Sequence, residues 1–148
     1  MRAILQRVSE ASVTTNEQTI GKIGFGWLVL LGFQETDDDE DIEYVCQKVL
    51  KLRLFPDEEN KFNLSVQDIK GSLLLVSQFT LYGDCRKGNR PSFQKAAPVG
   101  KAETLWLKSV QAFKRSGITV ETGQFQANMK ISLINDGPVT MILESKAK

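Results

Sequence analysis

The sequence predicts a mixed α/β fold, a strand-rich single domain of residues 1–148 with two main helices. Two segments carry apolar residues at helical spacing, and several short segments are continuously apolar or alternate between apolar and polar residues. Glycine and proline separate many of these segments. Because no repeat, low-complexity stretch or linker divides the chain, we expect one domain.

The first half of the chain predicts two strands and a helix. Residues 3–13 alternate loosely and indicate a strand, and the apolar run 27–31 is typical of a buried strand. Thr36 or Asp37 would cap a helix that continues to about Arg53, because an apolar stripe at helical spacing runs through this segment.

The second half predicts a helix among further strands. Residues 72–81 start with a strongly apolar run and indicate a strand, which a long loop, 82–100, follows. A second helix is expected over about 101–116, with Gly117 as its stop. Three short strands complete the prediction: 118–120, 129–134 and 139–143.

Composition excludes several kinds of chemistry. The chain has no histidine, so neither a Ser-His-Asp triad nor a histidine-ligated metal is available. Cys46 and Cys85 lack CxxC spacing, which argues against a disulfide scaffold or a zinc site. The net charge of +1 gives no global sign of a nucleic-acid partner. No signal peptide or membrane-spanning apolar run is present, so we expect a cytoplasmic protein without a membrane partner.

The acidic run "ETDDDEDIE", residues 35–43, has two interpretations. Its seven carboxylates would suit a hard cation, but the spaced ligands and turning glycine of an EF-hand loop are missing. As the N-terminal end of a helix the run needs no metal, because negative charge is favourable there. We therefore expect no metal and no cofactor.

Polar residues end the predicted strand 72–81. Ser77, Gln78 and Thr80 lie in "SQFTL", and strand ends that lead into long loops are common positions for functional sites. The alternative is a strand that frays into polar residues. Ser77 or Thr80 as a nucleophile would need an activating base. Without histidine we do not expect nucleophilic catalysis.

The loop "YGDCRKGNRPSFQK" is basic. Arg86, Lys87, Arg90 and Lys95 are balanced only by Asp84. A flexible basic loop fits a phosphate backbone, although an ordinary solvated loop would have the same composition.

The segment "NDGPVT", residues 135–140, separates the last two predicted strands. Asn135, Asp136 and Gly137 have the chemistry of a tight turn. The functional alternative is a rigid backbone wall formed by Gly137 and Pro138 with a cis peptide bond. Only about 5–6% of X–Pro bonds in folded proteins are cis, so the residue types alone favour trans.

Together these motifs resemble the D-aminoacyl-tRNA deacylases. "SQFTL" at 77–81, "KGNRPSF" at 87–93 and "NDGPVT" at 135–140 occur in the order of that family, with "QRV" at 6–8 and "KFNL" at 61–64. The resemblance covers essentially the whole chain. Two segments depart from it: "ANM" at 127–129 replaces a more frequent "ADM", and "LYGDC" at 81–85 replaces "LAADT" or "LFADT".

The resemblance implies β/β/α layers and an editing hydrolase without cofactor. The substrate would be tRNA that carries a D-amino acid, or glycine mischarged on tRNA-Ala, and no DNA partner is expected. Active sites would lie at the interface of a homodimer. A cis Gly137–Pro138 from one subunit would enter the pocket of the other and reject L-aminoacyl-tRNA by collision.

The resemblance also implies which residues act. Ser77, Gln78, Phe79 and Thr80 would form the catalytic site. An aminoacyl ester is already activated and the adjacent ribose hydroxyl would assist the attacking water. Backbone N–H groups near Phe79 and Thr80 would then stabilise the oxyanion.

Further residues would bind the substrate. Arg7 would fix the orientation of Gly137 and Pro138, and Met129 would line the amino-acid pocket. The tRNA would be held by Arg86, Lys87 and Arg90. Two other functions stay open at this point: a non-catalytic RNA- or DNA-binding module that uses the basic loop, and a metal-dependent hydrolase built on the acidic run.

Overall fold

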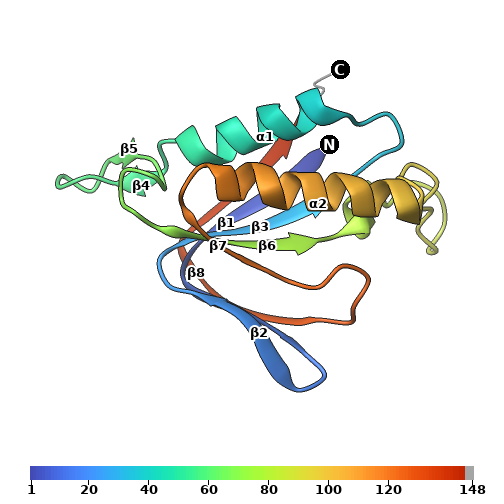
Figure 1. The fold of residues 1–148 in the computed structure, drawn as a ribbon, viewed down its shortest axis with the longest axis horizontal. Helices are drawn as coiled ribbons and strands as arrows, with labels where there is room; N and C mark the ends of the chain where they lie inside the picture. Colours follow the sequence, from blue (N-terminus) through green and yellow to red (C-terminus); the bar gives the residue numbers. More distant parts are fainter. Residues whose placement is uncertain (146–148) are drawn as a thin grey trace.

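The computed structural model describes residues 1–145, which form a strongly curved sheet with both helices on one face (Figure 1). The sheet consists of β1 (Arg2–Thr15), β2 (Gln18–Ile23), β3 (Gly26–Gly32), β6 (Ser72–Ser77), β7 (Thr119–Thr122) and β8 (Lys130–Glu144). The other elements are α1 (Asp39–Lys51), the hairpin β4 (Phe55–Pro56) and β5 (Phe62–Leu64), the 3-10 helix η1 (Phe79–Tyr82) and α2 (Val99–Arg115). The predicted mixed, strand-rich fold with two main helices is confirmed. Residues 146–148 of the predicted domain lie outside the described residues.

The long strand β1 organises the sheet. Its first half pairs with β3 and its second half with β2, both antiparallel, while β8 pairs along its other edge. The strands β3, β6 and β7 are parallel neighbours. Parallel pairing places Ser77, at the end of β6, beside Leu31 of β3. The carboxyl ends of these two strands therefore meet at one edge of the sheet.

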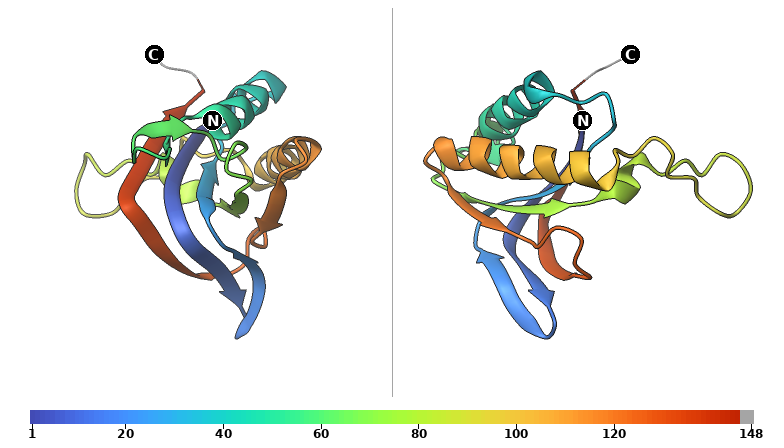
Figure 2. Two further views of the ribbon diagram at one scale, coloured as in Figure 1. Left: turned by 90° about the vertical axis from the view of Figure 1, so that its left-hand side faces the viewer. Right: turned by 45° about the vertical axis from the view of Figure 1, so that its right-hand side comes forward.

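Two apolar cores hold the fold together. The larger lies between the sheet and the helices and includes Trp27, Phe55 and Phe113, all fully buried. The smaller lies where the curved sheet closes on itself, as the views in Figure 2 show, and includes Val13 and Leu74. Burial of apolar surface in both cores is the main favourable term in folding. Within residues 1–145, neither helix has the length and apolar content needed to cross a lipid bilayer.

The cap of α1 differs from the prediction. Asp38, and not Thr36 or Asp37, caps the helix: its carboxylate accepts from the amides of Glu40 and Asp41, and the Asp41 carboxylate accepts from the Asp38 amide. This reciprocal arrangement satisfies amides that have no acceptor within the helix.

The neighbouring Asp37 has another role. Its buried carboxylate accepts from the ammonium group of Met1 and from the Gln34 amide. The interpretation of the acidic run as a helix N-terminus is thus confirmed. Among the described residues, no group of three Cys, Asp or Glu side chains is placed to hold a metal ion.

The helix α2 agrees closely with the prediction. It begins at Val99, two residues earlier than expected, directly after Pro98. It ends at Arg115, and Gly117 follows with φ +79°. Because L side chains rarely adopt this conformation, glycine suits the end of the helix.

The strand predicted over 72–81 is shorter in the structure. It ends at Ser77, where its partner β3 also ends, and the chain then turns into η1. The amide of Gln78 still donates to the Leu31 carbonyl at 2.8 Å, but the amide of Leu81 turns back to the Gln78 carbonyl. Most of "SQFTL" therefore lies on a helical turn and not on a strand.

The prediction of a turn at "NDGPVT" is wrong. β8 is one continuous strand, and residues 136–139 bulge out of its pairing with β1, opposite the single residue Arg7. The peptide bond between Gly137 and Pro138 is cis, contrary to the expectation from residue types alone. Proline is tolerated here because β8 is an edge strand, where its missing N–H breaks no ladder.

Candidate active site

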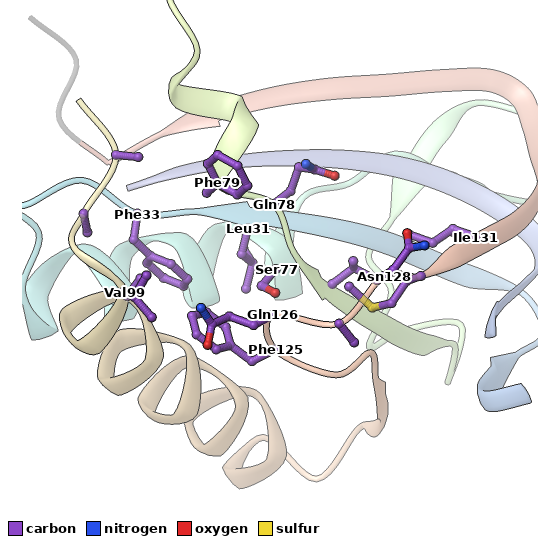
Figure 3. Close-up of a pocket in the computed structure, with 16 residues that line it drawn as sticks. Leu31, Phe33, Ser77, Gln78, Phe79, Val99, Phe125, Gln126, Asn128 and Ile131 are labelled. Carbon is purple, nitrogen blue, oxygen red and sulfur yellow. The ribbon is translucent and has the colours of Figure 1, made fainter. Parts of the chain in front are cut away.

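A cavity of about 520 Å³ opens where β3 and β6 end (Figure 3). Its walls come from these strand ends, from the start of α2 and from the loop between β7 and β8. Most of the lining side chains are apolar, and a few polar residues, among them Ser77 and Gln126, contribute to the lining. A concave, mainly apolar pocket with a few convergent polar groups is the usual form of a ligand site.

The segment from Ser77 to Thr80 is placed by the end of the sheet. Ser77, Gln78 and Phe79 line the cavity, whereas Thr80 lies just outside it on the exposed side of η1. The side-chain amide of Gln78 donates to the Thr80 hydroxyl. The first amides of a helical turn have no acceptor within the turn. Those of Phe79 and Thr80 are therefore available to a ligand.

Met129 forms part of the opposite wall. The loop before it is anchored by two hydrogen bonds, from the Gly123 amide to the Leu75 carbonyl at 2.8 Å and from the Thr15 hydroxyl to the Asn128 carbonyl at 3.1 Å. A Cβ on Gly123 would lie 2.6 Å from the Met129 sulfur, so glycine at this position leaves room for the Met129 side chain as it is placed. The structure thus brings Met129 into the same cavity as Ser77.

An aromatic pair marks the mouth of the cavity. The rings of Phe79 and Phe93 lie 5.2 Å apart in an edge-to-face arrangement, which is favourable for aromatic side chains. Phe79 is 59% exposed although it is apolar. Through this contact the basic loop is fixed next to the cavity, a relation that the sequence does not predict.

Arg7, Gly137 and Pro138 lie together at the bulge of β8, outside the lining of the cavity. The Arg7 guanidinium is 7% exposed and donates to the carbonyls of Asp136, at 3.1 Å, and Leu54, at 2.7 Å. These two hydrogen bonds connect the bulge of β8 to the chain before β4. Gly137 and Pro138 are themselves exposed and do not line the cavity of their own chain.

The basic loop extends from the body of the protein (Figure 2, right, yellow). Paired backbone hydrogen bonds between Asp84 and Ser92 close its base. Arg86 forms a two-pronged ion pair with Asp84 and, by these hydrogen bonds, holds the pKa of that carboxyl well below its usual range. Lys87 and Arg90 are exposed, and neither forms an ion pair within residues 1–145. Lys95, near the end of the loop, is likewise exposed and without an ion pair among these residues, so these three residues carry the positive charge available to a ligand.

Several lining residues carry no signal in the sequence. Phe33, Phe125 and Gln126 line the cavity, but nothing in their local pattern distinguishes them from ordinary core or loop residues. Only the φ of +60° at Gln126 is unusual, and it is visible in the structure alone.

Comparisons with known proteins agree with the motifs. A family model described as D-Tyr-tRNA(Tyr) deacylase matches residues 4–144. The D-aminoacyl-tRNA deacylase of Thermosipho africanus is 54% identical over 146 residues, which are 99% of this chain and 98% of that protein. The D-aminoacyl-tRNA deacylase of Clostridioides difficile is 54% identical over 145 residues, 98% of this chain and 97% of that protein.

Two solved structures share the fold. One, described as "c-Myc DNA Unwinding Element Binding Protein", has a TM-score of 0.93 at 40% identity and covers 99% of this chain and 100% of its own. The other, from work described as "Structural Analysis of a probable eukaryotic D-amino acid tRNA deacylase", has a TM-score of 0.85 over 97% of this chain and 98% of its own. At 16% identity, the second likeness concerns the fold alone. From its motifs and its full-length similarity to these relatives, this chain belongs to the D-Tyr-tRNA(Tyr) deacylase family.

Proposed function

We propose that this member of the deacylase family hydrolyses the ester of D-aminoacyl-tRNA and of glycyl-tRNA mischarged on tRNA-Ala. The products are free tRNA and the D-amino acid or glycine. The observation that carries the proposal is that Ser77, Gln78 and Phe79 of "SQFTL" line the same cavity as Met129. A cytoplasmic location stays a prediction.

The chemistry is assigned to backbone groups and to the substrate. The free amides of Phe79 and Thr80 stabilise the oxyanion of the tetrahedral intermediate, where preorganised donors are most effective. The ribose hydroxyl next to the ester assists the attacking water. The Thr80 hydroxyl, which Gln78 holds by a hydrogen bond, orients the ester or the water and is not a covalent nucleophile. Removing it would slow the reaction less than removing a backbone donor.

Substrate chirality is assigned to a second subunit. Gly137 and Pro138 are exposed on an edge strand and lie outside their own cavity, so a wall made from them requires another copy of the chain. In the proposed homodimer they enter the partner's cavity, and Arg7 keeps their backbone in place. An L side chain would collide with this wall, whereas a D side chain points away from it and glycine has no side chain to exclude.

Binding of the tRNA itself is assigned to the basic loop. Lys87 and Arg90 lie on the loop that the Phe79–Phe93 contact joins to the cavity, and they offer unpaired positive charge, with Arg86 as a weaker contributor. The solved relative whose description names a DNA element makes DNA the natural competitor to test. Phosphate contacts alone would not distinguish the two nucleic acids.

The proposal is tested by incubating purified protein with D-Tyr-tRNA, L-Tyr-tRNA and Gly-tRNA-Ala, each with and without a chelator. We expect hydrolysis of the D-ester and the glycyl ester, stability of the L-ester and no effect of the chelator. Retained tRNA or DNA binding without turnover would identify a binding module. Chelator-sensitive turnover would identify a metal-dependent hydrolase.

A further inference from the structure

We infer that Gln126 is a substrate-positioning residue whose carboxamide hydrogen-bonds the edge of the terminal adenine of the tRNA. The inference rests on the proposed function, because it assigns one end of the same cavity to one part of the proposed substrate. It follows from the layout of the cavity, from the chemistry of its two ends and from the backbone of Gln126.

The cavity has two ends with Ser77 between them (Figure 3). Asn128 lies toward one end, and the next residue, Met129, also lines the cavity; the proposed function assigns this end to the amino acid. Phe33 and Val99 lie at the other, beside α2. With the ester near Ser77 and the amino acid beside Met129, the end beside α2 is left for the nucleoside.

The end beside α2 suits a flat aromatic base. The side chains of Phe33, Val99 and Phe125 offer apolar surface and rings on which a base can stack. None of them has a hydrogen-bonding group, whereas the Gln126 carboxamide lies among them (Figure 3). A carboxamide carries a donor beside an acceptor, which matches the exocyclic amine of adenine beside its ring nitrogen.

Gln126 is exposed at the cavity, and its backbone conformation is unusual for a residue other than glycine. Its φ of +60° lies in the left-handed region, which is uncommon for residues other than glycine. The turn is closed by the backbone alone, through the Ala127 amide and the Gln124 carbonyl at 3.2 Å. Among the described residues, no hydrogen bond involves the Gln126 side chain. The fold therefore gains no polar contact from this glutamine, and strain of this kind is concentrated at functional sites.

Direct binding tests the inference without turnover. The probes are the stable amide 3′-(D-tyrosylamino)-3′-deoxyadenosine and its counterpart with purine, which lacks the exocyclic amine, in place of adenine. By calorimetry, wild-type protein should bind the adenine probe about three- to tenfold more tightly, the range for one hydrogen bond. In Gln126→Ala this ratio should fall to near one. Gln124→Ala, a glutamine of the same loop that does not line the cavity, should keep the wild-type ratio.

A second variant separates binding from folding. Glycine accepts a φ of +60° without strain, so Gln126→Gly should unfold at the same or a higher urea concentration than wild type while losing discrimination between the probes. The inference is overturned if both Gln126 variants keep the wild-type ratio, or if wild type binds the two probes equally. Hydrolysis of D-Tyr-tRNA by wild type tests the proposed function independently, because the binding ratio does not depend on turnover.

Discussion

At the scale of single residues, Arg7 shows how one side chain stabilises an irregular backbone. Residues 136–139 leave the regular ladder opposite Arg7, and the Arg7 guanidinium donates to the backbone of this bulge. It donates to two backbone carbonyls from two different elements, that of Asp136 in β8 and that of Leu54 before β4. Buried carbonyls without partners are costly, so this arginine links the bulge to the hairpin.

Arg7→Ala should therefore destabilise the protein measurably. Two hydrogen bonds from a charged donor would be lost in a buried place, which corresponds to about 2–3 kcal/mol in the free energy of unfolding. Urea denaturation measures this change. Arg53→Ala is the matched control, because Arg53 is exposed and donates to the Asn63 carbonyl on the surface. Equal losses in the two variants would contradict the role given to Arg7.

The two cysteines should differ strongly in reactivity. Cys46 is 3% exposed in the core, and burial raises the pKa of its thiol to about 11. At pH 8 it stays a neutral, shielded thiol, whereas Cys85 is exposed on the basic loop. Since the thiolate is the reactive form, a disulfide reagent should titrate one thiol in folded protein and two in guanidinium chloride. Cys85→Ser protein that still reacts rapidly when folded would refute this assignment.

At the scale of elements, features that depend on neighbouring residues in the sequence are predicted well. Features that depend on contacts between distant residues are not. The apolar stripe of α1 is buried as its spacing predicts, and Gly117 follows the end of α2. In contrast, the bulge in β8 depends on Arg7, a residue more than a hundred positions away in the sequence. Local turn chemistry in "NDGPVT" therefore indicates a turn that tertiary contacts override.

In the candidate site, too, residues within local motifs could be predicted and a residue placed by distant contacts could not. Ser77, Gln78, Phe79 and Met129 could be proposed from motifs, and the structure places all four on one cavity. The role proposed for Gln126 could not be predicted from the sequence, because the conformation of this residue is set by a loop that is anchored to other strands.

A further prediction at the scale of elements concerns the salt dependence of tRNA binding by the basic loop. Lys87→Ala combined with Arg90→Ala should lower the slope of log binding constant against log salt by about 1.4–1.8 for tRNA, at about 0.7–0.9 per lost phosphate contact. Arg86→Ala should have a smaller effect, because Asp84 already neutralises Arg86. Filter binding over a range of salt concentrations measures both slopes. An unchanged slope in the double variant would mean that the loop is only solvated.

At the scale of the whole molecule, the proposed active site requires two chains. The cavity of one chain lacks the wall that Gly137 and Pro138 are proposed to provide, and these residues are exposed in the single chain. We expect light scattering to give the mass of a dimer at assay concentration. A monomer with full activity and full preference for the D-ester would contradict the proposed arrangement.

The most direct test of a shared site is complementation between two inactive variants. Phe79→Pro impairs the catalytic segment, because proline has no N–H to donate to the oxyanion. Gly137→Ala impairs the wall and displaces the backbone carbonyls that are proposed to hold the amino group of the substrate, because its Cβ would lie 2.8 Å from the Val139 side chain and 3.0 Å from the Arg7 guanidinium at a φ of +127°. Each homodimer is first shown by circular dichroism to be folded, and single-turnover hydrolysis of D-Tyr-tRNA is then measured before and after the two are co-refolded in equal amounts. If the wall acts across the isologous interface, each mixed dimer has one intact site of two. Random pairing makes about half of the dimers mixed, so the mixture should regain about one quarter of wild-type activity. A mixture no more active than its two parents would show that each chain completes its own site, contrary to this account.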